Sequence, residues 1–378
     1  MTAYPLSFWE HESFLSRDFI IIGGGIIGLS TAISLHKTAP NATITLLERG
    51  IFPSGASTKN AGFACFGSLT EILSDCNRIG KDATLAIIEK RWRGLEILRK
   101  RLGDSAIGYE QYGGYELLFD EQKQAIEQID QVNMLLRPLF GQKVFSLDNS
   151  LIREFGFAPH KIHSLIKNPF EGQIHTGKMM KSLTQYSSEL GIEILTGINV
   201  REIIDEGSVA RVRCSHSSGD ITFHTGKVAV CTNALISELL PEYTIKPGRG
   251  QVLITSPIAL KFKGVFHFDE GFFYFRNVGN RVLFGGGRNI DFMGEETTEL
   301  QTTKRIQDRL EELLYSVILP DTSFEIEHRW AGIMGFSNSK LPIVQKSSAN
   351  VVVGFGCNGM GIALGSETGR ETAQLLLE

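Results

Sequence analysis

Three glycines at a fixed spacing, Gly23, Gly25 and Gly28, are followed twenty residues later by a carboxylate, Glu48. In this pattern the first glycine permits a tight turn, the second lets the backbone approach a pyrophosphate, and the third lets a helix pack closely on a strand. A helix that begins at such a turn offers unpaired N–H groups and partial positive charge to phosphates. Glu48 would accept hydrogen bonds from ribose hydroxyls and repel a 2′-phosphate, so NADP is not expected. The pattern predicts an adenine dinucleotide site.

The elements around these residues support that prediction. We expect a strand over residues 18–22, a helix from about Ile26 to Lys37, and a second strand from Thr43 to Glu48. A glycine-rich turn that only packs a helix on a sheet is the alternative explanation of the motif. FAD and NAD share the motif, so it does not separate them.

The rest of the chain mixes helical and strand patterns. Helices are expected over 82–102, 121–137, 178–190 and 298–315, antiparallel hairpins between 200 and 230, and a strand, glycine turn and helix at the end. These patterns predict an α/β fold, α+β overall, with a Rossmann-type cofactor domain and an interleaved, largely antiparallel-sheet substrate domain. The cofactor domain is expected to comprise residues 1–80, 150–244 and 340–378, and the substrate domain residues 81–149 and 245–339.

Two further glycine-rich segments favour FAD. Residues 50–62 form a loop of small and polar residues that can lay backbone N–H groups along a long ligand, and residues 354–361 form a turn that opens the last helix. With the first motif, these segments resemble the D-amino-acid oxidase superfamily, which includes glycine oxidase, sarcosine oxidase and the γ-glutamylputrescine oxidases. The chain looks nearer to the last of these than to true D-amino-acid oxidases. Other matching segments are Ser7-Phe8-Trp9-Glu10, Pro247-x-Arg249-Gly250-Gln251, Arg281 to Gly286, Trp330-Ala331-Gly332 and Leu341-Pro342.

The resemblance implies that FAD is the cofactor. In the family the first βαβ unit holds the ADP half, and the loop after the second strand runs beside the pyrophosphate and the flavin. Sarcosine-oxidase-like members attach the flavin through a cysteine near the Trp-Ala-Gly segment, where this chain has none, so we expect a noncovalent cofactor. The residues expected to contact FAD are Gly23, Gly24, Gly25, Ile27, Gly28, Glu48, Arg49, Ser57, Thr58, Lys59, Asn60, Ala61, Gly62, Val200, Gly332, Gly356, Asn358, Gly359, Met360 and Gly361.

The resemblance also implies the chemistry. A hydride would pass from the C–H next to nitrogen of an amine or amino acid to flavin N5, water would hydrolyse the imine, and O2 would reoxidise the flavin. Strand alternation places Phe272, Tyr274 and Arg276 on one face and Phe273 and Phe275 on the other. Because family members carry an active-site tyrosine on the corresponding strand, Tyr274 is the candidate substrate-facing hydroxyl, with Arg276 nearby at the edge of the site. An aromatic core face with an arginine that reaches solvent is the alternative.

Met334 departs from the family pattern. Amino-acid oxidases of the family place an arginine two residues after the glycine of Trp-Ala-Gly, where it grips the substrate carboxylate. This chain has Met334 there, and Arg329 need not point the same way. A buried, unpaired carboxylate is costly, so amines, or amino acids gripped from elsewhere, become the expected substrates.

Composition narrows the range of partners. The formal net charge is only −4 and 21% of the residues are charged, a balance that gives no electrostatic footprint for nucleic acid or an anionic membrane, so neither is expected as a partner. We expect no secretion signal, and no apolar run reaches the ~20 residues of a membrane span. Five scattered cysteines without paired spacing argue against a disulfide framework and a zinc site. We therefore expect a cytoplasmic protein without a metal.

Three alternative functions stay open. A dehydrogenase would keep the hydride step but pass electrons to a quinone or a protein carrier. A flavin-binding module would have lost catalysis, with Met334 as the sign of that loss. An NAD enzyme without flavin would be colourless when purified. The substrate, the electron acceptor and the oligomeric state do not follow from the sequence, because folds of this kind host many chemistries.

Overall fold

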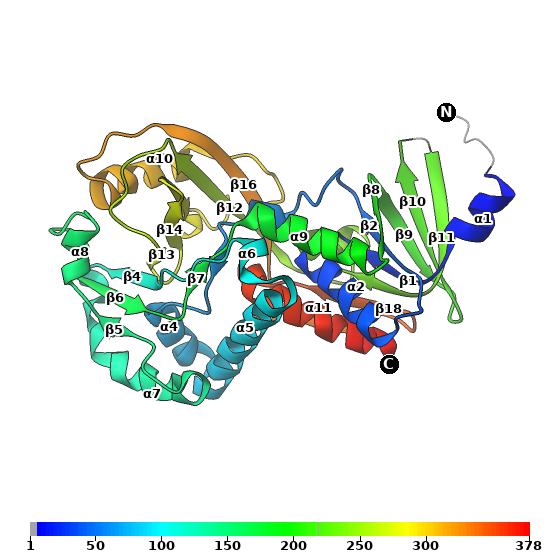
Figure 1. The fold of residues 1–378 in the computed structure, drawn as a ribbon, viewed down its shortest axis with the longest axis horizontal. Coiled ribbons are helices and arrows are strands. Elements are labelled where there is room, and N and C mark those ends of the chain that lie inside the picture. Colours follow the sequence, from blue (N-terminus) through cyan, green and yellow to red (C-terminus); the bar gives the residue numbers. More distant parts are fainter. Residues whose placement is uncertain (1–5, 218) are drawn as a thin grey trace.

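The structure is a computed structural model that describes residues 6–217 and 219–378. Two eight-stranded sheets form in this part of the chain, one in each half of an elongated molecule (Figure 1). The first sheet takes strands from both ends of the sequence, and the second takes strands from its middle. The fold is therefore α/β, with two interleaved units, as the sequence predicts.

Parallel strands form the centre of the first sheet, in the order β18-β11-β1-β2-β8. Ile20, Ile21 and Ile22 of β1 are all buried, as expected for a parallel strand that is covered on both faces. The predicted strand, helix and strand at the start of the chain are confirmed as β1, α2 and β2. The strands of this sheet are β1 (Ser16–Ile22), β2 (Ile44–Glu48), β8 (Glu193–Thr196), β9 (Asn199–Asp205), β10 (Ala210–His216), β11 (Gly219–Val230), β17 (Ile343–Lys346) and β18 (Val351–Phe355).

Strand β11 differs from the prediction of antiparallel hairpins between residues 200 and 230, because only part of it pairs antiparallel. Its first half pairs antiparallel with β10, and its second half pairs parallel with β1. Short-range patterns do not reveal such a change of partner, since the parallel partner lies some 200 residues away in sequence.

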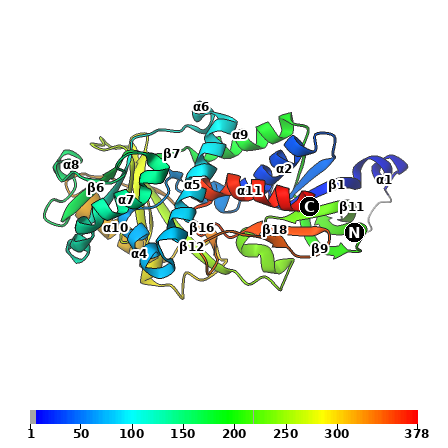
Figure 2. The same ribbon diagram turned by 90° about the horizontal axis from the view of Figure 1, so that it is seen from below.

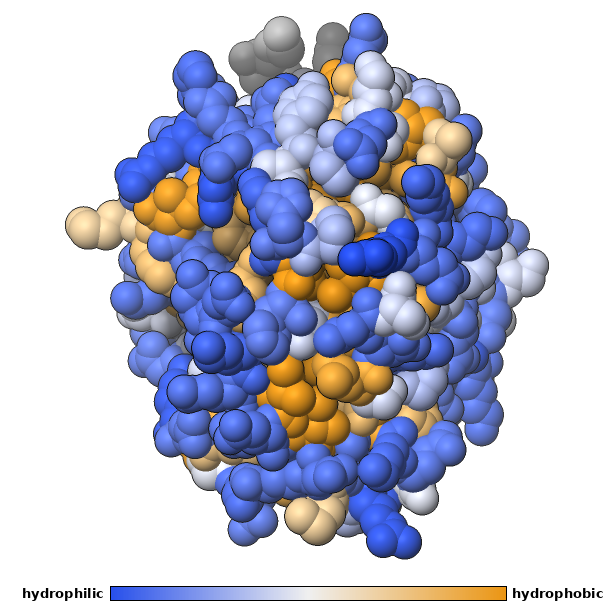
Figure 3. All heavy atoms as spheres, turned by 90° about the vertical axis from the view of Figure 1, so that its left-hand side faces the viewer, coloured by the Kyte–Doolittle hydropathy of each residue, from blue (hydrophilic) through white to orange (hydrophobic). Residues whose placement is uncertain are grey.

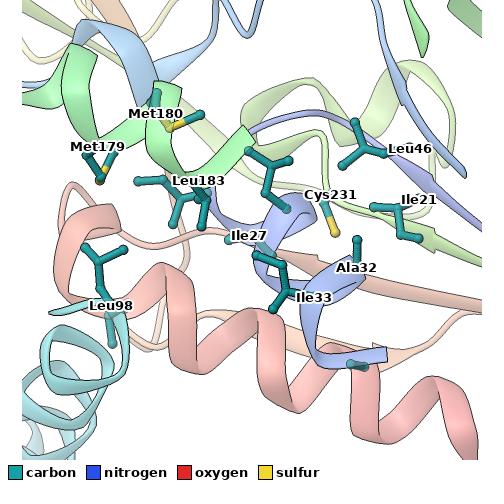
Figure 4. Close-up of a cluster of buried hydrophobic side chains, with 14 of the residues drawn as sticks. Ile21, Ile27, Ala32, Ile33, Leu46, Leu98, Met179, Met180, Leu183 and Cys231 are labelled. Carbon is teal, nitrogen blue, oxygen red and sulfur yellow. The ribbon is translucent and has the colours of Figure 1, made fainter. Parts of the chain in front are cut away.

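Helices α2 (Ile26–Thr38), α9 (Thr176–Glu189) and α11 (Gly361–Leu377) cover one face of the first sheet (Figure 2). Side chains from these helices, from the sheet and from α5 (Lys81–Leu102) form one buried cluster, in which Ile33, Leu98 and Leu183 take part (Figure 4). Helix α11 lies very close to α2, because a Cβ at Gly369 would lie 2.5 Å from the Cβ of Ser30. The strands β9 and β10 help to cover the opposite face.

The second sheet has the order β16-β12-β15-β14-β13-β4-β6-β5 and is antiparallel except between β13 and β4. Its outer face is aromatic: Phe266, Phe273 and Phe275 pack there against α10 (Lys304–Leu313) and the π-helix η4 (Leu314–Ile318). Its strands are β4 (Gly114–Leu118), β5 (Ser146–Leu147), β6 (Ser164–Asn168), β12 (Lys246–Thr255), β13 (Val265–Phe268), β14 (Phe273–Val278), β15 (Arg281–Gly286) and β16 (Ile326–Phe336).

Sheet membership bears on the expected domain limits. Strand β6 falls in the segment 150–244 that the sequence assigns to the cofactor domain, yet it pairs with β4 in the second sheet. The division into domains stays a prediction, and a limit drawn by sheet membership would come after Asn168. The remaining elements are α1 (Phe8–Phe14), α3 (Ala56–Lys59), β3 (Phe63–Ala64), α4 (Leu69–Ile79), α6 (Asp104–Ile107), η1 (Asp120–Gln128), α7 (Ile129–Phe140), α8 (Ser150–Glu154), β7 (Gly172–Gln173), η2 (Asn233–Glu238) and η3 (Arg288–Ile290).

The end of the molecule that carries α7 and α8 is mostly hydrophilic, and its apolar side chains form separate patches (Figure 3). Among the helices of residues 6–217 and 219–378, none is long and apolar enough to cross a membrane.

Candidate active site

The carboxyl ends of four parallel strands meet at one edge of the first sheet. Gly23 follows β1, Glu48 ends β2, Cys231 follows β11 and Gly356 follows β18. Such an edge, where the strand order reverses, is where open α/β sheets bind ligands. A cavity of about 810 Å³ begins here and continues to the inner face of the second sheet, where Tyr274 and Arg288 line it.

The glycine motif shapes the first end of this cavity. Gly23 has a φ of 105°, and a Cβ there would lie 2.7 Å from the carbonyl oxygen of Cys231. A Cβ at Gly28 would lie 1.9 Å from the carbonyl oxygen of Gly23, so only glycine lets α2 start this close to the strand. Gly25 is the N-cap of α2 and provides no side-chain hydrogen bond, which leaves N–H groups of the first turn for a ligand.

Glu48 is fixed by two backbone groups at the edge of the cavity. Its Oε2 accepts a hydrogen bond of 2.8 Å from the Gly24 N–H, and its Oε1 accepts one of 2.8 Å from the Gly50 N–H. Each oxygen keeps a further lone pair that a hydroxyl can use. Neighbouring Arg49 forms an ion pair of 3.2 Å with Glu238.

The loop after β2 is held by its own polar side chains. Ser57 Oγ accepts the Ile26 N–H at 3.0 Å, and Asn60 Nδ2 donates to the Ser57 carbonyl at 2.9 Å while its Oδ1 accepts the Gly62 N–H at 2.9 Å. Trp330 Nε1 donates to the carbonyl oxygen of Lys59 at 2.9 Å, which ties the loop to β16. The loop therefore forms a rigid bridge between the two sheets along one wall of the cavity.

A second helix N-terminus faces the cavity from the opposite wall. Met360 is the N-cap of α11 and offers no side-chain hydrogen bond, and Asn358, with a φ of 52°, shapes the turn before it. Asn358 Nδ2 donates to the Gly356 carbonyl at 2.7 Å, and its Oδ1 accepts the Ser337 N–H at 2.8 Å. This arrangement directs free N–H groups and positive helix-dipole charge into the cavity.

One row of residues crosses the inner face of the second sheet. By strand register, Glu116 lies beside His267, then come Tyr274, Gly285, Val252 and Trp330. The expected alternation is confirmed, because Tyr274 faces the cavity while Phe273 and Phe275 lie in the outer core. Burial raises the pKa of the Tyr274 hydroxyl to about 12, against the opposing effect of Arg288, so Tyr274 is a proton-bearing donor.

Arg276 lies on the same face as Tyr274. The sequence prediction placed it at the edge of the site, but it does not line the cavity. It is 6% exposed, and its guanidinium donates to the carbonyl oxygens of Ala61 (2.5 Å) and Ile174 (3.0 Å). The loop after β2 covers the guanidinium, which donates a hydrogen bond to the carbonyl of Ala61 in that loop. Arg276 therefore supports the loop.

Met334 lines the cavity at the position where the family's amino-acid oxidases carry arginine. A Cβ at Gly250 would lie 2.9 Å from Met334 Cε, and a Cβ at Gly359 would lie 3.4 Å from its sulfur. The side chain thus fills the space between β12 and the turn before α11. Arg329 points away, as expected, and pairs with Glu311 at 2.8 Å.

A family model described as FAD dependent oxidoreductase, abbreviated DAO, matches residues 18–375. The chain belongs to this family. It is therefore an FAD-dependent oxidoreductase, and the superfamily that the glycine motifs indicate is confirmed.

Relatives of this oxidoreductase match over most of its length. The probable oxidoreductase OrdL of Rhizobium meliloti (strain 1021) is 24% identical over 95% of this chain and 83% of its own. The γ-glutamylputrescine oxidoreductase of Escherichia coli (strain K12) is 24% identical over 96% of this chain and 84% of its own. Two longer relatives, both named bifunctional protein ThiO/ThiG, are matched over 33% and 53% of their own length. The structure of L-proline dehydrogenase from P. horikoshii superposes with a TM-score of 0.76 at 18% identity, covering 96% of this chain and 93% of that one.

The residues present fit FAD. Two helix N-termini whose N-cap residues make no side-chain hydrogen bond face the cavity. Thr232 Oγ1 also lines it and is buried without a hydrogen-bond partner among residues 6–217 and 219–378. Most residues expected to touch FAD line the cavity, but Gly24, Gly28, Thr58 and Gly356 do not, since they shape the backbone behind it. Those that line it are Gly23, Gly25, Ile27, Glu48, Arg49, Ser57, Lys59, Asn60, Ala61, Gly62, Val200, Gly332, Asn358, Gly359, Met360 and Gly361.

At the second end of the cavity lie residues that the sequence did not single out: His267, which lines the cavity, and two buried acids behind it, Glu116 and Glu171. Burial raises the pKa of Glu171 to about 8 and that of Glu116 to about 7, although backbone N–H groups or hydroxyls donate to both. Burial lowers the pKa of His267 to about 4. His267 Nε2 lies 3.8 Å from Glu171 Oε2, but with an uncharged imidazole this contact is not an ion pair.

Other cavity residues were also missed. Thr232 and Asn233 directly follow a central parallel strand, and that position was a usable signal. Arg288 follows the Gly286-Gly287 pair, and that glycine turn was a second usable signal in the sequence. Glu71, in contrast, reaches the cavity from α4 and pairs with Arg91 at 3.1 Å, and no local motif announces it.

Proposed function

We propose that this FAD-dependent oxidoreductase oxidises the C–N bond of an amine or amino acid and uses O2 to reoxidise the flavin. The observation that carries the proposal is the single cavity that joins the glycine-motif edge of the first sheet to Tyr274 on the second. It places a substrate-sized space next to the expected flavin position. Relatives with names such as γ-glutamylputrescine oxidoreductase and L-proline dehydrogenase support the substrate class.

In this proposal the residues of the chain bind and orient, and bound FAD supplies the hydride acceptor. The N-terminus of α2 holds the pyrophosphate, and Glu48 accepts hydrogen bonds from the ribose. The N-terminus of α11 would place positive potential next to the flavin. Tyr274 donates a hydrogen bond that orients the substrate. The apolar side chains Met334 and Phe336 keep water from the reacting C–H bond.

We also propose that the flavin is held without a covalent bond. Cys357 lines the cavity next to the turn before α11, and burial raises the pKa of its thiol to about 12. Burial raises the pKa of the Cys65 thiol as well. Neutral thiols are poor nucleophiles, so neither is suited to attach the flavin. Acid precipitation should therefore release all the flavin into the supernatant.

Anaerobic mixing of the purified holoenzyme with a panel of amines and amino acids tests the function. At least one compound should bleach the visible flavin absorbance, and admitting O2 should restore it with formation of hydrogen peroxide. Restoration only by a quinone would instead identify a dehydrogenase. If no member of the panel reduces the flavin, the proposal is wrong and a binding module is the better description.

A further inference from the structure

Arg288 is the first residue of η3, directly after the turn that follows β15, at the second end of the cavity. Gly286 and Gly287 precede it with φ values of 117° and 77°, which glycine adopts without strain. A Cβ at Gly286 would lie 2.0 Å from the carbonyl oxygen of Phe272, so the turn packs tightly against the backbone at the start of β14. Both Gly286 and Arg288 line the cavity.

Two aromatic rings hold the guanidinium of Arg288. Its central carbon lies 4.1 Å from the ring centre of Phe336 and 4.9 Å from that of Phe292. Phe336 can lie there because Gly248 has no side chain: a Cβ would come within 2.3 Å of the Phe336 ring. Stacking occupies the faces of the guanidinium and leaves its N–H edge for hydrogen bonds.

Arg288 forms no ion pair with a carboxylate of the described residues, although the charges of Glu296 and Glu295 act on it. The other arginines that line the cavity each have a carboxylate: Arg49 lies 3.2 Å from Glu238, Arg78 lies 3.8 Å from Asp75, and Arg91 lies 3.1 Å from Glu71. Within residues 6–217 and 219–378, the guanidinium of Arg288 makes neither an ion pair nor a hydrogen bond. A partly buried cation without a partner is suited to receive an anion.

The nearest acids are already occupied. Glu295 forms an ion pair of 2.8 Å with Arg249, and both side chains are almost fully buried. Glu296 lies 3.8 Å from Lys246. Arg288 is thus the one stacked guanidinium, in the described part of the cavity wall, that remains available to a ligand.

Tyr274 supplies a second donor close by. Its hydroxyl makes no hydrogen bond within the described residues, and a Cβ at Gly250 would lie 3.6 Å from it. We propose that Arg288, together with the Tyr274 hydroxyl, binds a carboxylate of the substrate, so that the substrate is an amine that also carries an acidic group. This inference rests on the proposed amine oxidation. It also explains how Met334 is tolerated: the cation comes from η3 and stacks on Phe336, two residues further along β16.

A pair of unreactive ligands tests the site directly. Benzoate and benzamide have nearly the same shape and differ in charge, and each perturbs the flavin absorbance when it binds next to the ring. The wild-type holoenzyme should bind benzoate about tenfold or more tighter than benzamide. Arg288→Met should abolish that preference and leave the Kd of benzamide nearly unchanged, and Arg288→Lys should keep part of it.

Arg305→Met is the matched control, because Arg305 lies on neighbouring α10, pairs with Asp291 and is outside the cavity lining. It should keep the full preference for benzoate. Flavin content and the unfolding midpoint of each variant show whether it is folded. Equal affinity of the wild type for the two ligands, or equal loss of both in Arg288→Met, overturns the proposal.

Reduction of the flavin separates this inference from the proposed function. Each amino acid that bleaches the flavin should lose about tenfold or more in affinity as its carboxamide, and that difference should vanish in Arg288→Met. If amines reduce the flavin but the ligand pair shows no charge preference, the oxidation stands and the role of Arg288 is wrong. If benzoate binds through Arg288 but no amine reduces the flavin, the anion site stands and the oxidation is wrong.

Discussion

Glu171 is a carboxyl group whose ordinary environment would be water, and here it lies 2% exposed behind the cavity wall. Its Oε1 accepts the N–H groups of Phe66 (3.1 Å) and Gly67 (3.4 Å), and Glu71 and Glu116 lie near enough to oppose its ionisation. His267 faces it from β13 and is uncharged at neutral pH. Glu171 therefore keeps its proton near neutral pH.

This state makes the stability of the protein depend on pH. The pKa of Glu171 rises from 4.5 to about 8 on folding, so the folded chain holds a proton that the unfolded chain releases. The buried, protonated Glu171 makes its full contribution to stability below pH 4.5. That contribution is lost as pH rises toward and through about 8, because the unfolded chain releases the proton first. Glu171→Gln keeps a carbonyl acceptor and removes the titration. We expect the variant to gain about 1–3 kcal/mol over the wild type between about pH 5 and pH 8.5.

Urea unfolding at several pH values measures this difference. Glu89→Gln is the control, because Glu89 is exposed and pairs with Arg93 on the surface of α5. It should follow the wild-type pH profile. Parallel profiles for Glu171→Gln and the wild type would show that Glu171 ionises normally.

Single residues also show how far sequence reasoning reaches. The structure brings Gly23, Gly25 and Glu48 together at one end of the cavity, as a local turn and a nearby strand allow the sequence to predict. Glu171 was not predicted, because it contacts Phe66, which is 105 residues away. Arg276 was placed at the cavity edge because alternation gives the face of a strand but not the loop that covers it.

At the scale of elements, the position of α11 depends on its contact with α5. A Cβ at Gly94 of α5 would lie 1.9 Å from the carbonyl oxygen of Ala363, in the first turn of α11. The two helices can approach so closely only because Gly94 has no side chain. The contact therefore sets where the N-terminus of α11 points into the cavity.

Gly94→Ala should push the two helices apart. We expect a loss of about 1–3 kcal/mol of unfolding free energy in the protein without FAD, together with weaker FAD binding, because the first-turn N–H groups of α11 move. Gly55→Ala is the control for stability, since no atom lies within 4 Å of its Cβ position and its φ is −80°. Thermal unfolding and fluorescence titration with FAD measure the two effects. Equal stability of both variants would contradict the close contact.

Elements were mostly predictable where one local pattern defines them. The expected helix over 82–102 is α5, and the expected helix from about Ile26 is α2. The helix expected over 298–315 begins only at Lys304, and Thr303 just before it forms hydrogen bonds with Gln251 and Glu295. Side-chain networks between distant segments leave no periodic signal in the sequence, so the sequence does not predict how they shift the ends of a helix.

At the scale of the whole molecule, FAD is expected to lie between the two sheets and to hold them together. Ligand that binds only the folded state stabilises it in proportion to the logarithm of its concentration. FAD at one hundred times its Kd should therefore raise the unfolding free energy by about 2.7 kcal/mol. Thermal unfolding with and without FAD measures this shift. NAD is the control and should give no shift at the same concentration, whereas an equal shift with NAD would contradict the assignment of the cofactor site.

The packing of α11 on α2 has a consequence for biosynthesis. Helix α2 and strand β1 emerge from the ribosome early, yet the helix and strand that complete their core, α11 and β18, follow more than 300 residues later. The first βαβ unit must therefore remain incompletely covered during most of translation. Chaperones would meet its exposed isoleucines in that interval, and cofactor loading would be a late event in the maturation of the nascent chain.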